Sequence, residues 1–332
     1  MKIDAIMTAG LDGVAAAATA AEHQGFDGLM LPEVAHDPFL PAPLAAASTS
    51  SIRLATGIAV AFARSPMTVA VTASDIHRFS GGRFVLGLGT QIKPHVTRRF
   101  SMPWSEPTAR MHEFISAVRA IWHAWQEQVP LDFRGDFYQL TLMTPMFDHG
   151  PSPCGWPAVH VGAVGPLMTS MVGEVADGLI THGFTTAEYL REVTLPRLDA
   201  GLRRAGRVRA DIEVSLPLMA AVVRDESDSQ IDAMRSTIAF YGSTPAYRPV
   251  LEHHGWGSLG DELHALSKRG AWSTMGTLID DDVLHTFAAV GDPKTVAALA
   301  TERYCGLVDR VQIGIAPDAP VNEILDALRS HV

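Results

Sequence analysis

The sequence predicts an α/β protein, because strand-like and helix-like segments alternate about eight times along its 332 residues. Alternating units of this kind imply a parallel sheet, and eight of them in one chain favour a closed barrel. An open doubly wound sheet would instead carry a Gly-x-Gly-x-x-Gly fingerprint early in the chain. The nearest segment, residues 87–92, lacks the third glycine. The predicted fold is therefore a (β/α)8 TIM barrel with insertions, in a single domain over residues 1–332.

Composition argues against several classes of protein. The formal net charge of −10 does not suit a nucleic-acid-binding surface. No stretch approaches the roughly 20 apolar residues of a membrane span, and Asp4, Asp12 and Glu22 interrupt any signal-peptide core. Cys154 and Cys305 are too few for a disulfide framework. We expect a cytoplasmic protein with neither nucleic-acid nor membrane partners.

Cap and turn residues mark the first four strand–helix units. Ser65 and Pro66 form an N-cap and first-turn pair for a helix that stops at Gly81 and Gly82. Gly25 ends an earlier helix in the same way. The predicted strands cover residues 3–7, 28–31, 52–60 and 84–88, and the predicted helices begin near residues 14, 42 and 66.

The most regular amphipathic helix follows, with apolar residues at intervals of three and four from Met111 to Trp125. We interpret its aromatic stripe as a buried core face rather than a binding surface. Residues 131–138 predict a hairpin around Gly135 and Asp136, and residues 143–156 a loop.

The second half of the chain continues the alternation. Pro166 predicts the start of a helix that stops at Gly178, and Asp292 with Pro293 starts a later one. Strands are predicted at residues 158–161, 179–181, near 212–223 and at 308–315, and further helices through 189–198, at 227–241 and at 321–328. The pattern weakens over residues 242–275, which we interpret as an insertion and a candidate lid.

One loop has almost no side-chain bulk. Gly162, Ala163, Val164 and Gly165 connect a predicted strand to the helix that begins at Pro166. Such a loop exposes backbone N–H groups at the positive end of the helix dipole, which suits a phosphate. A tight connection that needs glycine only to turn explains the local pattern equally well.

The candidate acid/base residues follow the second strand. In a TIM barrel the active site lies at the C-terminal ends of the strands, where Glu33, His36 and Asp37 are expected. Histidine titrates near neutrality, and an adjacent carboxylate raises its pKa. A hydrogen-bonded turn is the alternative. His95 and His182 follow other strands and are further candidates.

The sequence does not predict a metal site or a covalent nucleophile. His112 begins a segment like a zinc-protease helix, but Ser116 stands where the second histidine is needed. His253 and His254 are neighbours that would diverge on a helix. Because no Gly-x-Ser-x-Gly elbow or P-loop is present, we expect a cofactor to carry the reactive centre.

A set of short motifs occurs together, mostly within roughly the first 200 residues. They are residues 31–33 (LPE), 36–41 (HDPFLP), 56–66 (TGIAVAFARSP), 80–84 (SGGRF), 86–89 (LGLG), 100–104 (FSMPW), 162–166 (GAVGP) and 176–178 (ADG), with 291–293 (GDP) as a weaker match. Together they resemble the luciferase-like monooxygenase superfamily, in its branch of coenzyme F420-dependent oxidoreductases.

The resemblance implies a barrel that binds a flavin-like ring at the strand C-termini. A non-prolyl cis peptide is expected under the ring at Gly57-Ile58, and the loop before Pro166 would hold the phosphate-bearing tail. Lys93 and Arg98 could neutralise an acidic tail. The cofactor-binding residues expected on this basis are Gly57, Ile58, Ala59, Gly89, Thr90, Lys93, Gly162, Ala163, Val164, Gly165, Pro166, Leu167, Met168 and His182.

One departure from the branch limits the choice of reaction. Its sugar-phosphate dehydrogenases place a catalytic glutamate just after the strand-four glycines, where this chain reads TQIK at residues 90–93. The catalytic histidine of those dehydrogenases follows strand two, and His36 corresponds to it only if the intervening spacing is allowed to differ.

We expect hydride transfer between coenzyme F420 and a small organic substrate. His36 would transfer the proton, and Glu33 or Asp37 would orient the His36 ring. An FMN-dependent monooxygenase and a cofactor-binding protein without catalysis are the alternatives. A homodimer is expected by family analogy.

Overall fold

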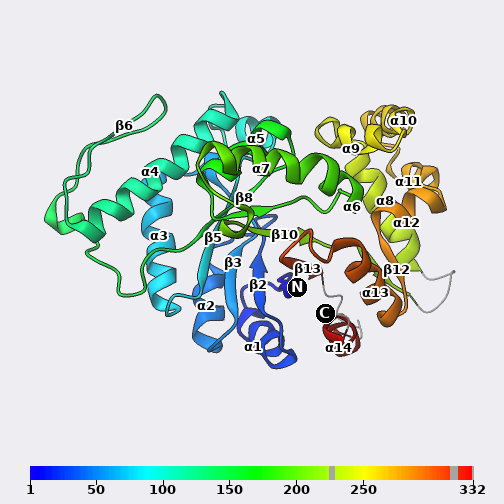
Figure 1. Cartoon of the computed structure of the whole chain (residues 1–332), viewed down its shortest axis with the longest axis horizontal. Helices are drawn as coiled ribbons and strands as arrows, with labels where there is room; N and C mark the ends of the chain where they lie inside the picture. Colours follow the sequence, from blue (N-terminus) through cyan, green and yellow to red (C-terminus); the bar gives the residue numbers. More distant parts are fainter. Residues whose placement is uncertain (224–228, 315–320, 331–332) are drawn as a thin grey trace.

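The computed structural model describes residues 1–223, 229–314 and 321–330, and Figure 1 shows its strands at the centre with helices around them. The main-sheet strands are β1 (Lys2–Ile6), β2 (Gly28–Leu31), β3 (Arg53–Thr56), β4 (Ala59–Val60), β5 (Phe84–Gly89), β8 (Val159–Gly162), β9 (Gly178–Ile180), β10 (Glu213–Pro217) and β13 (Arg310–Gly314).

These strands form a closed parallel barrel. Their order is β3-β2-β1-β13-β10-β9-β8-β5-β4, and the pairing of β3 with β5 closes the ring. β3 and β4 occupy one position because both pair with β5, so nine strands give eight positions. The predicted TIM barrel is confirmed, and the strand predicted at residues 52–60 is two pieces separated by Gly57 and Ile58.

Helices surround the barrel and fill the connections. They are α1 (Val14–Gln24), α2 (Pro41–Ser48), α3 (Pro66–Phe79), α4 (Pro107–Glu127), α5 (Pro166–Val175), α6 (Ala187–Tyr189), α7 (Leu195–Arg204), α8 (Ser229–Gly242), α9 (Arg248–His253), α10 (Gly257–Lys268), α11 (Trp272–Met275), α12 (Asp281–Phe287), α13 (Pro293–Tyr304) and α14 (Val321–Ser330). Shorter turns include η2 (His95–Arg99), η4 (Leu190–Thr194) and η6 (Pro245–Tyr247). Within the described residues, none of these helices combines the length and apolar character needed to cross a bilayer.

The local predictions in the first half are largely confirmed. The Ser65 hydroxyl accepts from the Thr68 N–H at the start of α3, and Gly25 adopts φ +86° at the end of α1. Trp122 and Trp125 of α4 are buried, which confirms the core stripe. Strands β6 (Phe133–Arg134) and β7 (Gln139–Leu140) pair antiparallel as the predicted hairpin.

A layer of charged side chains lies inside the N-terminal end of the barrel. The Arg310 Nε of β13 donates to the Asp4 Oδ2 of β1 at 2.7 Å, and the two residues are each 2% exposed. The Arg53 Nη1 of β3 donates to Glu213 Oε1 of β10 at 2.7 Å. The pKa of His160 of β8 lies well below its usual range, mainly because the ring is buried and also because the charges of Arg53 and Arg310 are near. The ring is therefore neutral.

Two glycines leave room for this layer. A Cβ at Gly28 of β2 would overlap the Asp4 carboxylate, and one at Gly178 of β9 would lie 2.5 Å from the His160 ring. The prediction that Gly178 stops a helix was therefore wrong. α5 ends at Val175, because the backbone becomes extended at Ala176. Gly178 is the first residue of the next strand, β9.

A helical unit fills the chain between β10 and β13, at the right of Figure 1. Short strands β11 (Ala220–Val222) and β12 (Ala289–Gly291) pair with each other outside the barrel, so the strand predicted near 212–223 is two strands. Helices α8 to α12 bury their own apolar cluster, which includes Leu251, Leu263 and Phe287. The segment predicted as an insertion, residues 242–275, lies within this unit, whereas residues 227 and 315 lie outside the described part of the chain.

We expect Gly178→Ala to destabilise the barrel, because the new methyl group would meet the buried His160 ring at 2.5 Å. Overpacking of this kind lowers the free energy of unfolding by about 1–3 kcal/mol, which urea denaturation would measure. Gly314→Ala is the matched control, since a Cβ at Gly314 meets nothing within 4 Å. Equal loss in both variants would contradict this account of the charged layer.

Candidate active site

Three neighbouring positions of the barrel carry glycine at the C-terminal end. Gly57 follows β3, and Gly89 and Gly162 end β5 and β8. The side chain of Ile58 lies across two of them, since a Cβ at Gly89 would be 2.6 Å from Ile58 Cδ1 and one at Gly162 3.3 Å from Ile58 Cγ2. The glycines therefore leave a mouth whose surface on this side is the Ile58 side chain.

The peptide bond between Gly57 and Ile58 is cis, as the resemblance led us to expect. Immediately after it, Ala59 is fully buried and pairs with Leu88 of β5. Thr90 directly follows β5, so it lies at the same end of the barrel.

An ion cluster holds the chain beyond this bond. The Glu33 Oε2 accepts from the Val60 N–H at 2.7 Å and from Arg64 Nη1 at 2.7 Å. Arg64 Nη2 donates to Asp37 Oδ2 at 2.8 Å. Burial alone would lower the pKa of Arg64, but the two carboxylates outweigh it and raise the pKa. Arg64 thus joins the loop after β2 to the end of β4.

This cluster corrects the expected role of the two carboxylates. Among the hydrogen bonds of the described residues, none joins Glu33 or Asp37 to His36, and the imidazole is exposed on the loop after β2. Glu33 and Asp37 bind Arg64 instead of orienting the histidine. Proton transfer by His36 stays a prediction.

His182 occupies a different environment, just beyond β9. It lies on the same strand face as Gly178 and Ile180, which point into the barrel. Its Nδ1 accepts from the Phe184 N–H at 2.9 Å, so the ring proton is on Nε2. Burial lowers the pKa of His182 to about 4, which keeps the imidazole neutral near pH 7.

Two tyrosines of the helical unit enclose this histidine. The Tyr247 ring of η6 stacks on His182 with centroids 4.3 Å apart, and the Tyr241 ring of α8 meets it edge-on at 4.6 Å. Burial, and then Tyr241, raise the pKa of Tyr247 to about 12, so that hydroxyl stays protonated. The result is an aromatic wall around a neutral imidazole whose Nε2–H can donate.

The loop before α5 has the predicted strand–loop–helix form. Pro166 is the first residue of α5, and Gly165 before it is extended at ψ 154°. In the described part of the chain, no side chain caps this helix end. The side chain of Leu167 is 75% exposed, and a Cβ at Gly165 would meet nothing within 4 Å. The N–H groups of Leu167 and Met168 are therefore accessible to an anion.

Exposed basic residues lie on the segment after β5. Lys93, His95 and Arg98 are exposed, and Arg99 Nη2 donates to the Val34 carbonyl at 2.7 Å, which ties this segment to the loop after β2. The structure brings them to the mouth side of the barrel, and their contact with a cofactor stays a prediction.

Comparison with known proteins decides the family. Residues 4–310 match the sequence pattern described as Luciferase-like monooxygenase. The chain belongs to the luciferase-like monooxygenase family. It is therefore an oxidoreductase of this family, and the fold and the cis peptide agree with that assignment.

Relatives within the luciferase-like family cover most of the chain. An uncharacterized protein of Mycobacterium tuberculosis (strain ATCC 25618 / H37Rv) is 52% identical over 313 residues, which are 94% of this chain and 92% of that protein. The 5,10-methylenetetrahydromethanopterin reductase of Methanopyrus kandleri is 27% identical over 291 residues, which are 83% of this chain and 80% of that protein. The structure of the coenzyme F420 dependent tetrahydromethanopterin reductase from Methanopyrus kandleri matches with a TM-score of 0.80 at 24% identity. It covers 99% of this chain and 96% of that one, and shows the same fold.

A groove of about 640 Å³ lies elsewhere on this luciferase-like barrel, on the outside between α4, α5 and α7. Pro166 and Leu167 line one part of it, whereas Ile58, His36 and His182 do not. The barrel mouth is the candidate active site, because the three glycines and the neutral His182 all lie at the C-terminal ends of barrel strands.

Two features of this site were missed in the sequence. Arg64 belongs to the TGIAVAFARSP motif, and its charge within an apolar run was the available signal for a buried ion pair. Tyr241 ends a predicted helix and Tyr247 lies in a stretch with no readable motif, so no local signal placed either ring against His182.

The pKa of His182 predicts a loss of stability in acid. An unfolded histidine titrates near 6.5, whereas the folded His182 titrates near 4, so only the unfolded chain takes up this proton between those values. Stability is therefore lost as the pH falls from about 6.5 to about 4, by up to about 1.4 kcal/mol per pH unit. Urea unfolding of wild type and His182→Gln over this range would measure the difference, and parallel pH curves would contradict it.

Proposed function

We propose that this chain transfers hydride between coenzyme F420 and a small organic substrate at the barrel mouth. The observation that carries the proposal is that the barrel mouth and the N-terminus of α5 lie close together along the chain. Gly162 lies beneath Ile58 at the mouth, and Pro166 begins α5 only four residues later. At about 3.3–3.6 Å per residue, the mouth and the anion-accepting helix end lie within about 15 Å of each other along the chain.

That arrangement suits a planar ring with a phosphate-bearing tail. Small residues and Ile58 would lie against the ring, and the N–H groups at the α5 N-terminus would bind the phosphate. Lys93 and Arg98 would balance further acidic groups of the tail. The Methanopyrus kandleri relative at 27% identity is named a methylenetetrahydromethanopterin reductase, which supports a reductive rather than an oxygenating chemistry here.

When bound, F420 supplies the carbon that gives or accepts the hydride. The side chains of this protein then have two tasks. His182 holds its proton on Nε2 and can donate a hydrogen bond to an oxygen or nitrogen of the substrate, without itself becoming charged. His36, exposed after β2, would exchange the proton that accompanies hydride transfer with solvent.

The helical unit that contains residues 242–275 would roof this site. The ring contacts of Tyr241 and Tyr247 with His182 support this role. We also propose a cytoplasmic homodimer, and light scattering of the purified protein would test the dimer.

Cofactor titration tests the proposed function. We expect purified protein to bind F420 more tightly than FMN, as measured by changes in absorbance and fluorescence. Tight FMN binding with no F420 binding would overturn the proposal in favour of an FMN-dependent monooxygenase. Binding of F420 without turnover of alcohols, aldehydes, imines or activated alkenes would indicate a cofactor-binding protein without catalysis.

A substitution at the α5 N-terminus tests the phosphate site separately. In Gly165→Asp, the carboxylate would cap the N–H groups and repel a phosphate, so F420 affinity should fall about tenfold or more. The melting temperature should not fall, because an aspartate cap stabilises a helix.

Gly165→Ala is the matched control, since a Cβ there meets nothing and the backbone is extended. It should bind F420 like the wild type. Unchanged affinity in Gly165→Asp would place the phosphate elsewhere.

A further inference from the structure

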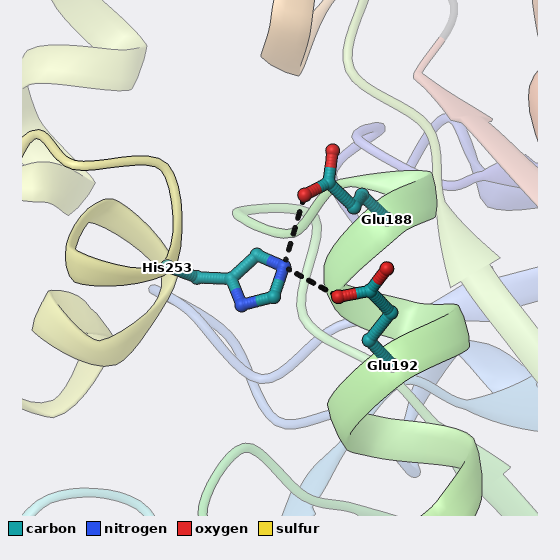
Figure 2. A group of neighbouring side chains, drawn as sticks. All are labelled: Glu188, Glu192 and His253. Atoms are coloured by element: carbon teal, nitrogen blue, oxygen red, sulfur yellow. Dashed lines mark ion pairs between the residues drawn. The ribbon is translucent and has the colours of Figure 1, made fainter.

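A second group of titratable side chains lies between the barrel and the helical unit. Glu188 of α6 and Glu192 of η4 are one helical turn apart, and His253 is the last residue of α9. Figure 2 shows both carboxylates directed at the same imidazole nitrogen. The His253 Nε2 lies 3.3 Å from Glu188 Oε1 and 3.6 Å from Glu192 Oε2.

The imidazole is held in place by its neighbours. The Tyr189 ring meets His253 edge-on at 5.4 Å, and the His254 ring does so at 5.2 Å. His254 is itself engaged, because its Nε2 lies 2.9 Å from the Thr186 hydroxyl and its ring stacks on Trp256. Only His253 therefore presents its nitrogen to the carboxylates.

That nitrogen lacks a hydrogen-bond partner. The His253 Nε2 is buried and, within the described residues, makes no hydrogen bond of acceptable geometry. A proton on Nε2 could point at only one of the two carboxylates, and neither is placed to accept it well. Across the described part of the chain, Glu188 and Glu192 have no ion pair with lysine or arginine.

The separations fit a cation placed between the three groups. In a tetrahedral zinc site with bonds of about 2.0–2.2 Å, neighbouring ligand atoms lie about 3.3–3.6 Å apart. The two measured distances from Nε2 are close to this, and the three donor atoms lie within 4.8 Å of one another. Two carboxylates with a neutral imidazole also balance a divalent charge, and the mixed nitrogen and oxygen set suits zinc better than calcium or magnesium.

We propose that Glu188, Glu192 and His253 bind one divalent transition-metal ion of the zinc class. The ion would join α9 of the helical unit to the α6–η4 helix that follows β9. Because the same helical unit supplies Tyr241 and Tyr247, the ion would fix the wall around His182 from outside. Three protein ligands leave a further position for water.

Zinc binding to the full-length protein tests this site. After treatment with a chelator, we expect titration with zinc chloride in a calorimeter to give one ion bound per chain, while magnesium chloride gives no comparable heat. His253→Gln should abolish this binding. Glu188→Gln and Glu192→Gln should each weaken it about tenfold or more, and zinc should raise the melting temperature of the wild type but not of His253→Gln.

Glu252→Gln is the matched control, because it removes the same charge next to His253 from a carboxylate that pairs with Arg248. It should bind zinc like the wild type. Circular dichroism without metal would show that each variant is folded. Zinc binding that is absent, or unchanged in the three ligand variants, would overturn the proposal, whatever the result of the F420 titration.

Discussion

Arg310 of β13 and Asp4 of β1, which are two positions apart in the register of the last and first strands of the barrel, form an ion pair that is almost fully buried. Removing one partner of such a pair would leave an uncompensated charge at a cost of about 3–5 kcal/mol. The register that brings these residues together therefore also determines where the two ends of the chain meet. Glu213 and Arg53 extend the same layer to β10 and β3, so charges on four strands constrain the ring from within.

At the opposite, C-terminal end of the barrel, glycines leave space that side chains would otherwise fill. Gly89 and Gly162 make room for Ile58, and Glu33 with Arg64 holds the chain just after it. The N-terminal end is thus filled with paired charge and the C-terminal end is lined by backbone and one aliphatic side chain. This division follows the general rule for TIM barrels, in which stability is built at one end and chemistry at the other.

The helical unit contributes to the site from outside the barrel. Its tyrosines pack around His182, whose burial lowers the pKa and keeps the imidazole neutral, while His253 contacts the helix after β9. Both contacts involve residues at the junction of two separately packed apolar clusters.

The sequence by itself determined the alternation of strands and helices, the closed barrel, the Ser65 cap and the start of α5 at Pro166, because periodicity and capping are local properties of a chain. The motifs also located the Gly57-Ile58 bond. Only the tertiary structure decided which charges meet. It pairs Glu33 and Asp37 with Arg64 rather than with His36. It also shows that glycine is needed at position 178 because the His160 ring occupies the space of a Cβ. Such partners lie 18 to 31 residues apart along the chain. A local pattern shows that a side chain is charged or small but does not show which residue it will contact.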